Sequence, residues 1–212
     1  MLDPDGKRSA FASTADRDST FMAHPTAVVD EGAVIGPGTR IWHFCHVMTG
    51  ARIGKAVSLG QGVFVASGAV IGDGCRLQNN ISVFEGVELE SDVFCGPSVV
   101  FTNVRTPRAF VSRKDEFDST LVRRGASLGA NCCIVCGNEI GEYAMVAAGA
   151  VVTRDVLPHQ LVAGVPAHHL GWVCRCGERL DFGTGSRHCV RCGDDYVLVS
   201  EEEGVRRVST RE

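Results

Sequence analysis

The chain has 212 residues, a formal net charge of −4 and 44% apolar residues. This length suits one good-sized domain with a small appendage, and the mildly negative charge gives no reason to expect a nucleic-acid partner. No apolar run reaches the roughly 18 residues of a membrane helix, so we expect no membrane insertion. Glycine occurs 25 times, nearly twice its usual share of about 7%, which indicates many tight turns.

Residues 1–22 are polar and charged where a secretory signal would carry an apolar stretch. We therefore expect this segment to be disordered and the protein to be cytoplasmic. The ten cysteines are too few for a disulfide scaffold, and a cytosolic chain keeps its thiols reduced. They are interpreted as core residues or metal ligands.

A six-residue repeat dominates residues 23–172. An apolar residue recurs at every sixth position: Val29, Ile35, Ile41, Val47, Ile53, Leu59, Val65, Ile71, Leu77, Val83, Leu89, Cys95 and Phe101. A second set of mostly small or β-branched residues follows four places after each. Neither the helical period of 3.6 nor the strand period of 2 explains this spacing. We predict short strands, each followed by a turn, that wind into a coil and bury two side chains per hexapeptide.

The repeat stops after Phe101 and resumes out of phase at Val122. Residues 105–120 are therefore predicted to leave the coil as an excursion loop, which a solenoid tolerates on one face. If one coil takes three hexapeptides, every third hexapeptide stacks about 4.8 Å from its neighbour. His43, Gln61 and Asn79 then form one outward column, and Thr49, Ser67, Glu85 and Asn103 form another. Each column is either a polar ladder or part of a binding surface.

Several motifs carry a family resemblance: Ile41-Trp42-His43-Phe44, Leu77-Gln78-Asn79-Asn80, Phe94-Cys95-Gly96-Pro97-Ser98, Val100-Phe101-Thr102-Asn103-Val104 and Gly164-Val165-Pro166-Ala167. With the repeat, they resemble the hexapeptide-repeat acyltransferases, whose fold is an all-β, left-handed parallel β-helix. They are most similar to bacterial enzymes that acetylate the 3-amino group of UDP-2-acetamido-3-amino-2,3-dideoxyglucuronic acid for surface polysaccharides. The left hand rests on this resemblance alone, because parallel crossovers generally favour the right hand.

The resemblance implies a homotrimer with active sites between subunits, and acetyl-CoA as co-substrate. A neutral amine must attack the thioester carbonyl, so a proton acceptor is needed. An asparagine that matches Asn103 holds the sugar amine in these enzymes, and Glu85 or His43 is the candidate to orient the amine or take its proton. Gln61, Asn79 and Asn80 are expected to contact the sugar nucleotide.

The excursion carries Arg105, Arg108, Arg113 and Lys114. Arginine forks suit a diphosphate or a uronate carboxylate, so Arg108, Arg113 and Lys114 are candidate substrate ligands. The alternative is a solvated loop whose own acidic residues pair with these cations.

The expected acetyl-CoA contacts lie in the last coils: Gly149, Ala150, Arg154, Gly164, Val165, Pro166, Ala167 and His168. Many relatives carry arginine or lysine after Gly-Val-Pro-Ala, suited to a CoA phosphate, whereas this chain has His168 and His169. Arg154 is the candidate to compensate.

Residues 173–199 carry two cysteine pairs, Cys174 with Cys176 and Cys189 with Cys192, each followed by glycine. This spacing is typical of a zinc ribbon with four thiolates around one structural zinc, although the first pair is one residue shorter than usual. A closed four-sulfur site stabilises a fold and does not catalyse. Residues 200–212 are expected to be a disordered polar tail.

Three other functions remain open. The first keeps the chemistry and changes the sugar to a dTDP-3-amino-3,6-dideoxyhexose. The second is a γ-class carbonic anhydrase, against which stands the spacing of His43, His46 and His159. The third is a non-catalytic hexapeptide scaffold.

Overall fold

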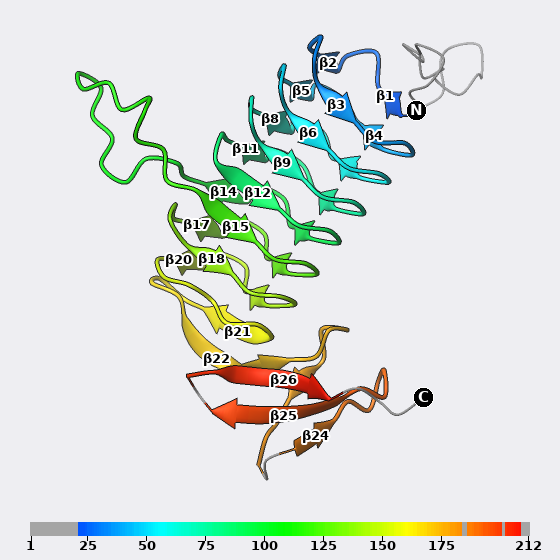
Figure 1. The fold of residues 1–212 in the computed structure, drawn as a ribbon, viewed down its shortest axis with the longest axis vertical. Coiled ribbons are helices and arrows are strands. Elements are labelled where there is room, and N and C mark those ends of the chain that lie inside the picture. The colour runs from blue at the N-terminus through cyan, green and yellow to red at the C-terminus, as the bar shows by residue number, and fades with distance from the viewer. Residues whose placement is uncertain (1–20, 184–185, 201, 209–212) are drawn as a thin grey trace.

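The structure is a computed structural model that describes residues 21–183, 186–200 and 202–208. It consists of a parallel β-helix, followed by a small antiparallel unit at its C-terminal end (Figure 1). The predicted all-β fold of coiled hexapeptide repeats is confirmed. None of these described residues lies in a helix, so the described part of the chain has no helix long and apolar enough to span a bilayer.

The β-helix has three faces made of very short strands. The first face contains β1 (Met22–Ala23), β4 (Arg40–Ile41), β7 (Ser58–Leu59), β10 (Arg76–Leu77), β13 (Phe94–Cys95), β16 (Ser127–Leu128) and β19 (Met145–Val146). The second contains β2 (Val28–Val29), β5 (His46–Val47), β8 (Phe64–Val65), β11 (Ser82–Val83), β14 (Val100–Phe101), β17 (Cys133–Ile134) and β20 (Val151–Val152). The third contains β3 (Val34–Ile35), β6 (Arg52–Ile53), β9 (Val70–Ile71), β12 (Val87–Leu89), β15 (Thr120–Val122) and β18 (Glu139–Ile140).

Each hexapeptide contributes one strand and one turn, as its pattern predicts. Arg40 pairs with Ser58, and Ser58 pairs with Arg76, so a full coil takes three hexapeptides. Both repeating sets of apolar residues point inward, and Leu59 and Val63 are fully buried. Thr39 is a polar residue of this core, and its hydroxyl donates to Gly54 O at 2.8 Å and accepts from Val57 N at 3.1 Å.

An ion-pair ladder ties three coils together on the third face. Arg123 lies 3.0 Å from Glu90 Oε1 and 2.7 Å from Glu139 Oε1, and the backbone N–H of Arg124 donates to Glu90 Oε2 at 2.8 Å. Partial burial alone would raise the pKa of Glu90, but the bonds from Arg124 N–H and the Arg123 guanidinium outweigh it and lower that pKa.

The excursion comprises residues 102–119, between β14 and β15, and projects away from the coils (Figure 1). The coil continues in register beyond it, because Phe94 pairs with Ser127 and Val100 pairs with Cys133. Thr120, which the sequence assigned to the excursion, is instead a buried residue of β15. It pairs with Val87 in the neighbouring coil and so occupies an inward-facing position of the repeat.

The β-helix ends in an antiparallel return. β21 (Gln160–Ala163) continues the first face parallel to β19, and β22 (His168–Val173) turns back along it and pairs with β23 (Arg179–Leu180). A second sheet follows, made of β24 (Ser186–His188), β25 (Asp195–Ser200) and β26 (Gly204–Val208).

Two boundary predictions are wrong. Within the predicted disordered segment 1–22, Phe21 packs against the core and Met22 belongs to β1, while residues 1–20 lie outside the described residues. Within the predicted tail 200–212, β26 pairs with β25 because the buried Val205 joins an apolar cluster under Trp172. Residues 201 and 209–212 lie outside the described residues. The unit predicted over 173–199 therefore includes β26 as well.

Candidate functional site

The first polar column follows the corner between the first and second faces. His43, Gln61 and Asn79 stack there beside Trp42 and line a shallow hollow of about 270 Å³. The column is partly a ladder, since the backbone N–H of Gln61 donates to Asn79 Oδ1 at 3.1 Å. Its outer rim keeps polar groups exposed around the hollow, so this corner can also accept a polar ligand.

The ring of His43 is held between aromatic neighbours. It stacks on His24 with ring centroids 3.5 Å apart, and it lies parallel to Trp42 at 6.4 Å. Partial desolvation and the neighbouring His43 lower the pKa of His24, so the His24 imidazole is neutral near pH 7. Asn80, the remaining predicted contact here, follows Asn79 in the same turn with φ of 60°, and its N–H donates to Gln61 O at 2.9 Å.

The second column follows the corner between the second and third faces. Ser82 pairs with Val100, and this register stacks Glu85 below Asn103 in adjacent coils. Asn103 closes the base of the excursion, because its carbonyl oxygen accepts from Asp118 N at 3.0 Å. Glu85 is exposed and Asn103 half-buried, so both side chains can reach a ligand. His43 lies at the other corner, so one chain does not bring the three candidate catalytic residues together.

The cations of the excursion divide into two groups. Arg105 pairs with Asp118 at 2.7 Å and Arg113 pairs with Glu116 at 2.6 Å, and all four line a hollow of about 410 Å³. These two arginines are thus largely neutralised within the loop. Among the described residues, Arg108 and Lys114 have no carboxylate partner, and both are exposed. Of the three predicted anion ligands, Arg108 and Lys114 remain available and Arg113 is engaged.

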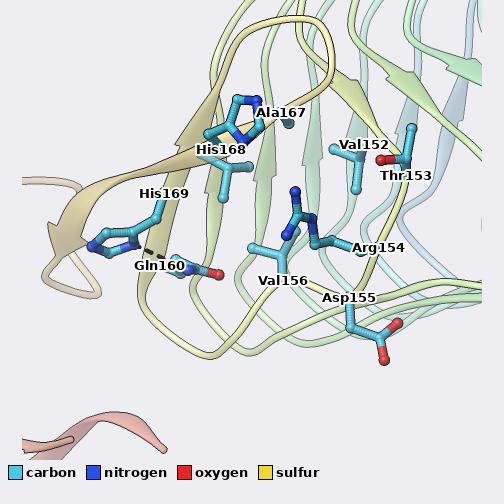
Figure 2. A pocket seen from close by; sticks show the side chains of 10 residues that line it. Val152, Thr153, Arg154, Asp155, Val156, Gln160, Ala167, His168 and His169 are labelled. Carbon is cyan, nitrogen blue, oxygen red and sulfur yellow. Dashed lines mark hydrogen bonds between the residues drawn. The ribbon is translucent and has the colours of Figure 1, made fainter. Parts of the chain in front are cut away.

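A narrow hollow of about 110 Å³ lies where β22 returns against the last coil (Figure 2). Three predicted cofactor contacts line it: Arg154, Ala167 and His168. The side chains of Arg154 and His168 face the same space from opposite walls, and no described carboxylate pairs with Arg154. His169 also lines the hollow, and its Nδ1 lies 3.0 Å from Gln160 Nε2. Sequence reasoning missed Gln160, because the antiparallel return that brings it here leaves no hexapeptide signal.

The remaining predicted cofactor contacts lie around the adjoining corner. Gly164 O accepts from Val151 N at 3.0 Å, and Ala167 N donates to Val151 O at 2.8 Å, so the turn that also contains Val165 and Pro166 is tied to β20. Val165 is 73% exposed. Gly149 has open space where a side chain would begin, whereas Ala150 is fully buried and offers only its backbone.

The four cysteines of the C-terminal unit converge. The sulfur atoms of Cys174, Cys176, Cys189 and Cys192 all lie within 4.8 Å of one another, and they form the one cluster of potential metal ligands found among the described residues. Cys174 Sγ and Cys192 Sγ are 3.2 Å apart, and Cys176 Sγ and Cys189 Sγ are 3.6 Å apart. Around zinc, thiolates at 2.3 Å in a tetrahedron stand about 3.8 Å apart, so the four residues fit this ion.

Five of the other six cysteines are buried in the coils, and Cys133 is half-buried on β17. Burial raises the pKa of Cys75 to about 11 and that of Cys132 to about 12, and it raises that of Cys95 as well. Cys45 donates its thiol proton to Gly60 O at 3.0 Å. Buried protonated thiols are poor nucleophiles, so a cysteine-based mechanism does not fit these sites.

The histidine set needed for a γ-class carbonic anhydrase does not assemble within the chain. His46 pairs with Asp30 at 3.2 Å, and His159 is buried at the far end of the β-helix against Tyr143 and Tyr196. The family described as bacterial transferase hexapeptide (six repeats) matches residues 32–67.

Known proteins resemble much longer parts of the chain. The dTDP-3-amino-3,6-dideoxy-alpha-D-galactopyranose 3-N-acetyltransferase of Aneurinibacillus thermoaerophilus is 44% identical over 177 residues, which cover 84% of this chain and 91% of the relative. The bifunctional protein GlmU of Shouchella clausii is 31% identical over 63% of this chain and 27% of its own length. The crystal structure of PerB from Caulobacter crescentus, with CoA and GDP-perosamine, has 22% identity and a TM-score of 0.48, covering 72% of this chain and 58% of PerB.

The chain therefore belongs to the hexapeptide-repeat sugar N-acetyltransferases, and it is an enzyme of that family.

Proposed function

We propose that the enzyme transfers the acetyl group of acetyl-CoA to the 3-amino group of a dTDP-linked 3-amino-3,6-dideoxyhexose. The observation that carries this proposal is the 44% identity to the Aneurinibacillus enzyme, whose printed name gives that substrate class. The likeness spans the coils, the excursion and part of the C-terminal unit, since it covers 84% of this chain.

The excursion supports a neutral sugar over a uronate. Two of its arginines already bind Asp118 and Glu116, so the loop has less free positive charge than its composition indicates. Arg108 and Lys114 remain to pair with the diphosphate that every nucleotide sugar carries. The UDP-linked 2-acetamido-3-amino-2,3-dideoxyuronic acid remains the second candidate, because these two cations also suit a carboxylate.

The proposed reaction forms an N–C bond at the acetyl carbonyl carbon and breaks the C–S bond of the thioester. Asn103 holds the sugar amine through its side-chain amide, and the adjacent Glu85 orients the ammonium or accepts the proton that it loses. The departing thiolate takes up a proton. Backbone N–H groups of the turns stabilise the carbonyl oxygen as negative charge develops.

The acetyl donor is proposed to bind at the C-terminal hollow. Arg154 and His168 line one space there, and a guanidinium beside an imidazole suits a CoA phosphate. Many relatives have arginine or lysine where this chain has His168 and His169. In the proposed site Arg154 supplies that cation instead.

We further propose a homotrimer whose active site uses both corners, His43 of one protomer lying near Asn103 of the next. The exposed Phe44 and Phe94 support an interface on the first face and its corner, since monomers seldom leave large apolar patches open. Analytical ultracentrifugation tests the assembly, and a monomer at working concentration would contradict it.

A mass-spectrometric assay tests the function directly. Purified enzyme with acetyl-CoA is offered dTDP-3-amino-3,6-dideoxygalactose in one reaction and UDP-2-acetamido-3-amino-2,3-dideoxyglucuronate in another. We expect one added acetyl group on the dTDP-sugar and a much lower rate on the uronate. Preference for the uronate would overturn the sugar assignment, and acetylation of neither would favour the scaffold.

A further inference from the structure

The C-terminal unit is built from two tight loops that face each other. In the first, Gly177 N donates to Cys174 O, and in the second, Gly193 N donates to Cys189 O, each at 2.8 Å. Both glycines have positive φ, 90° and 79°, which a side chain would resist at these sharp turns. Each loop therefore aims two sulfur atoms at the same point.

Contacts outside the sulfur cluster hold the two loops together. Arg191 of the second loop bonds Glu178, just past the first, at 2.8 Å. Asp194, which is almost fully buried, accepts from Arg175 and from Arg207 of β26. These bonds fix the loops' spacing, so the site is formed by the fold and does not depend on a chance approach of thiols.

A tyrosine links the sulfur cluster to the last coil. The Tyr196 hydroxyl lies 3.1 Å from Cys174 Sγ and accepts from Arg175 N at 3.0 Å, and the residue is fully buried. Its ring packs edge-on against His159, which stacks in turn on Tyr143 of the β-helix. Val173 N donates to His159 O at 2.8 Å, immediately before Cys174. The cluster is thus continuous with the end of the coil.

We propose that Cys174, Cys176, Cys189 and Cys192 bind one structural zinc ion, and that the zinc-bound unit caps the C-terminal end of the β-helix. Four thiolates at tetrahedral spacing leave no open coordination position, so the ion stabilises and does not take part in acetyl transfer. Without it, four thiols within 4.8 Å of one another lose their common partner, and only the polar contacts of Glu178, Asp194 and Tyr196 hold the loops together. The cap's apolar cluster, which includes Trp172, Leu180 and Val205, then loosens.

Metal analysis of the full-length protein tests the site. Elemental analysis by plasma mass spectrometry should give one zinc per chain for the wild type, and less than about one tenth of that for Cys174→Ser and Cys192→Ser. Cys133→Ser, in the β-helix, is the matched control and should keep its zinc. Cys176→His should also retain zinc, because three cysteines and one histidine form an equally good set. Metal-free wild type, iron in place of zinc, or zinc that survives both serine variants would overturn the proposal.

Hydrogen exchange tests the capping role without relying on those variants. Zinc is removed from the wild type with a chelator and restored in a second sample. Removal should speed exchange in residues 172–183 and 186–208 at least tenfold and leave the coils around residues 41–101 unchanged, and added zinc should reverse it. Equal exchange in both samples would refute the capping role. Because neither readout involves a sugar, failure here is distinct from failure of the proposed function.

Discussion

Gly72 directly follows β9, and the next coil lies close to it. A Cβ at this position would lie 2.6 Å from Glu90 C and from Ser91 N, whereas ordinary contacts begin near 3.4 Å. Gly72→Ala therefore forces the two coils apart by about 0.8 Å. The Gly72 N to Leu89 O hydrogen bond, now 2.7 Å, lies at the same place and would be stretched to the limit of a hydrogen bond.

The expected cost combines two effects. Loss of one backbone hydrogen bond costs about 1 kcal/mol, and overpacking against a rigid backbone adds about 1 to 3 kcal/mol. A chain of this size loses roughly 2 to 4 °C of melting temperature per kcal/mol, so Gly72→Ala should melt about 5 to 15 °C lower.

Thermal unfolding followed by circular dichroism measures this difference. Gly183→Ala is the matched control, because no atom lies within 4 Å of its Cβ position, and it should melt close to the wild type. If Gly72→Ala also melted within 2 °C of the wild type, the coils would be more compliant than this reasoning assumes.

Three further predictions concern the site and the ladder. Asn103→Ala should lower kcat/KM for the sugar by at least about tenfold with an unchanged melting temperature, while Thr49→Ala, three coils earlier in the same column, should not; equal effects would remove Asn103 from the reaction. Arg154→Ala should raise the KM for acetyl-CoA by about tenfold with little change in kcat, with Arg76→Ala as control, and an unchanged KM would place the donor elsewhere. The pKa of Glu90 is lowered in the folded chain, so the stabilisation by its ion pair is present above the ordinary pKa of 4.5 and is lost as the pH falls below that value. Glu90→Gln should therefore reduce the difference in melting temperature between pH 7 and pH 4. An undiminished difference would contradict the ladder's role.

The coil could be predicted because every hexapeptide repeats one environment. Leu59, Val65 and Ile71 each pair with an equivalent apolar residue one coil away. The spacing alone therefore predicted which residues form strands, which form turns and which are buried. The antiparallel C-terminal strands do not repeat one environment in this way. β26 was mistaken for a tail because its one fully covered apolar residue, Val205, depends on Trp172, far away in sequence.

The site was predictable column by column but not as a whole. Stacking at one corner placed Glu85 beside Asn103 from their spacing alone. The partners of Arg105 and Arg113 within the excursion depend on loop geometry that a charge count does not contain. His43 faces a different corner, and its proposed part in the reaction depends on the proposed trimer, which one chain's periodicity does not encode.

In most folds a change in a loop also affects the stability of the core, but the excursion between β14 and β15 separates these two properties. Because Phe94 still pairs with Ser127 beyond it, the loop's length and sequence can change without shifting any strand of the core. If the excursion binds the substrate as proposed, substrate preference can diverge through this loop by insertion, deletion or exchange between relatives, while the coils keep their stability. The same independence makes the excursion a practical graft site for redirecting the enzyme to another nucleotide sugar.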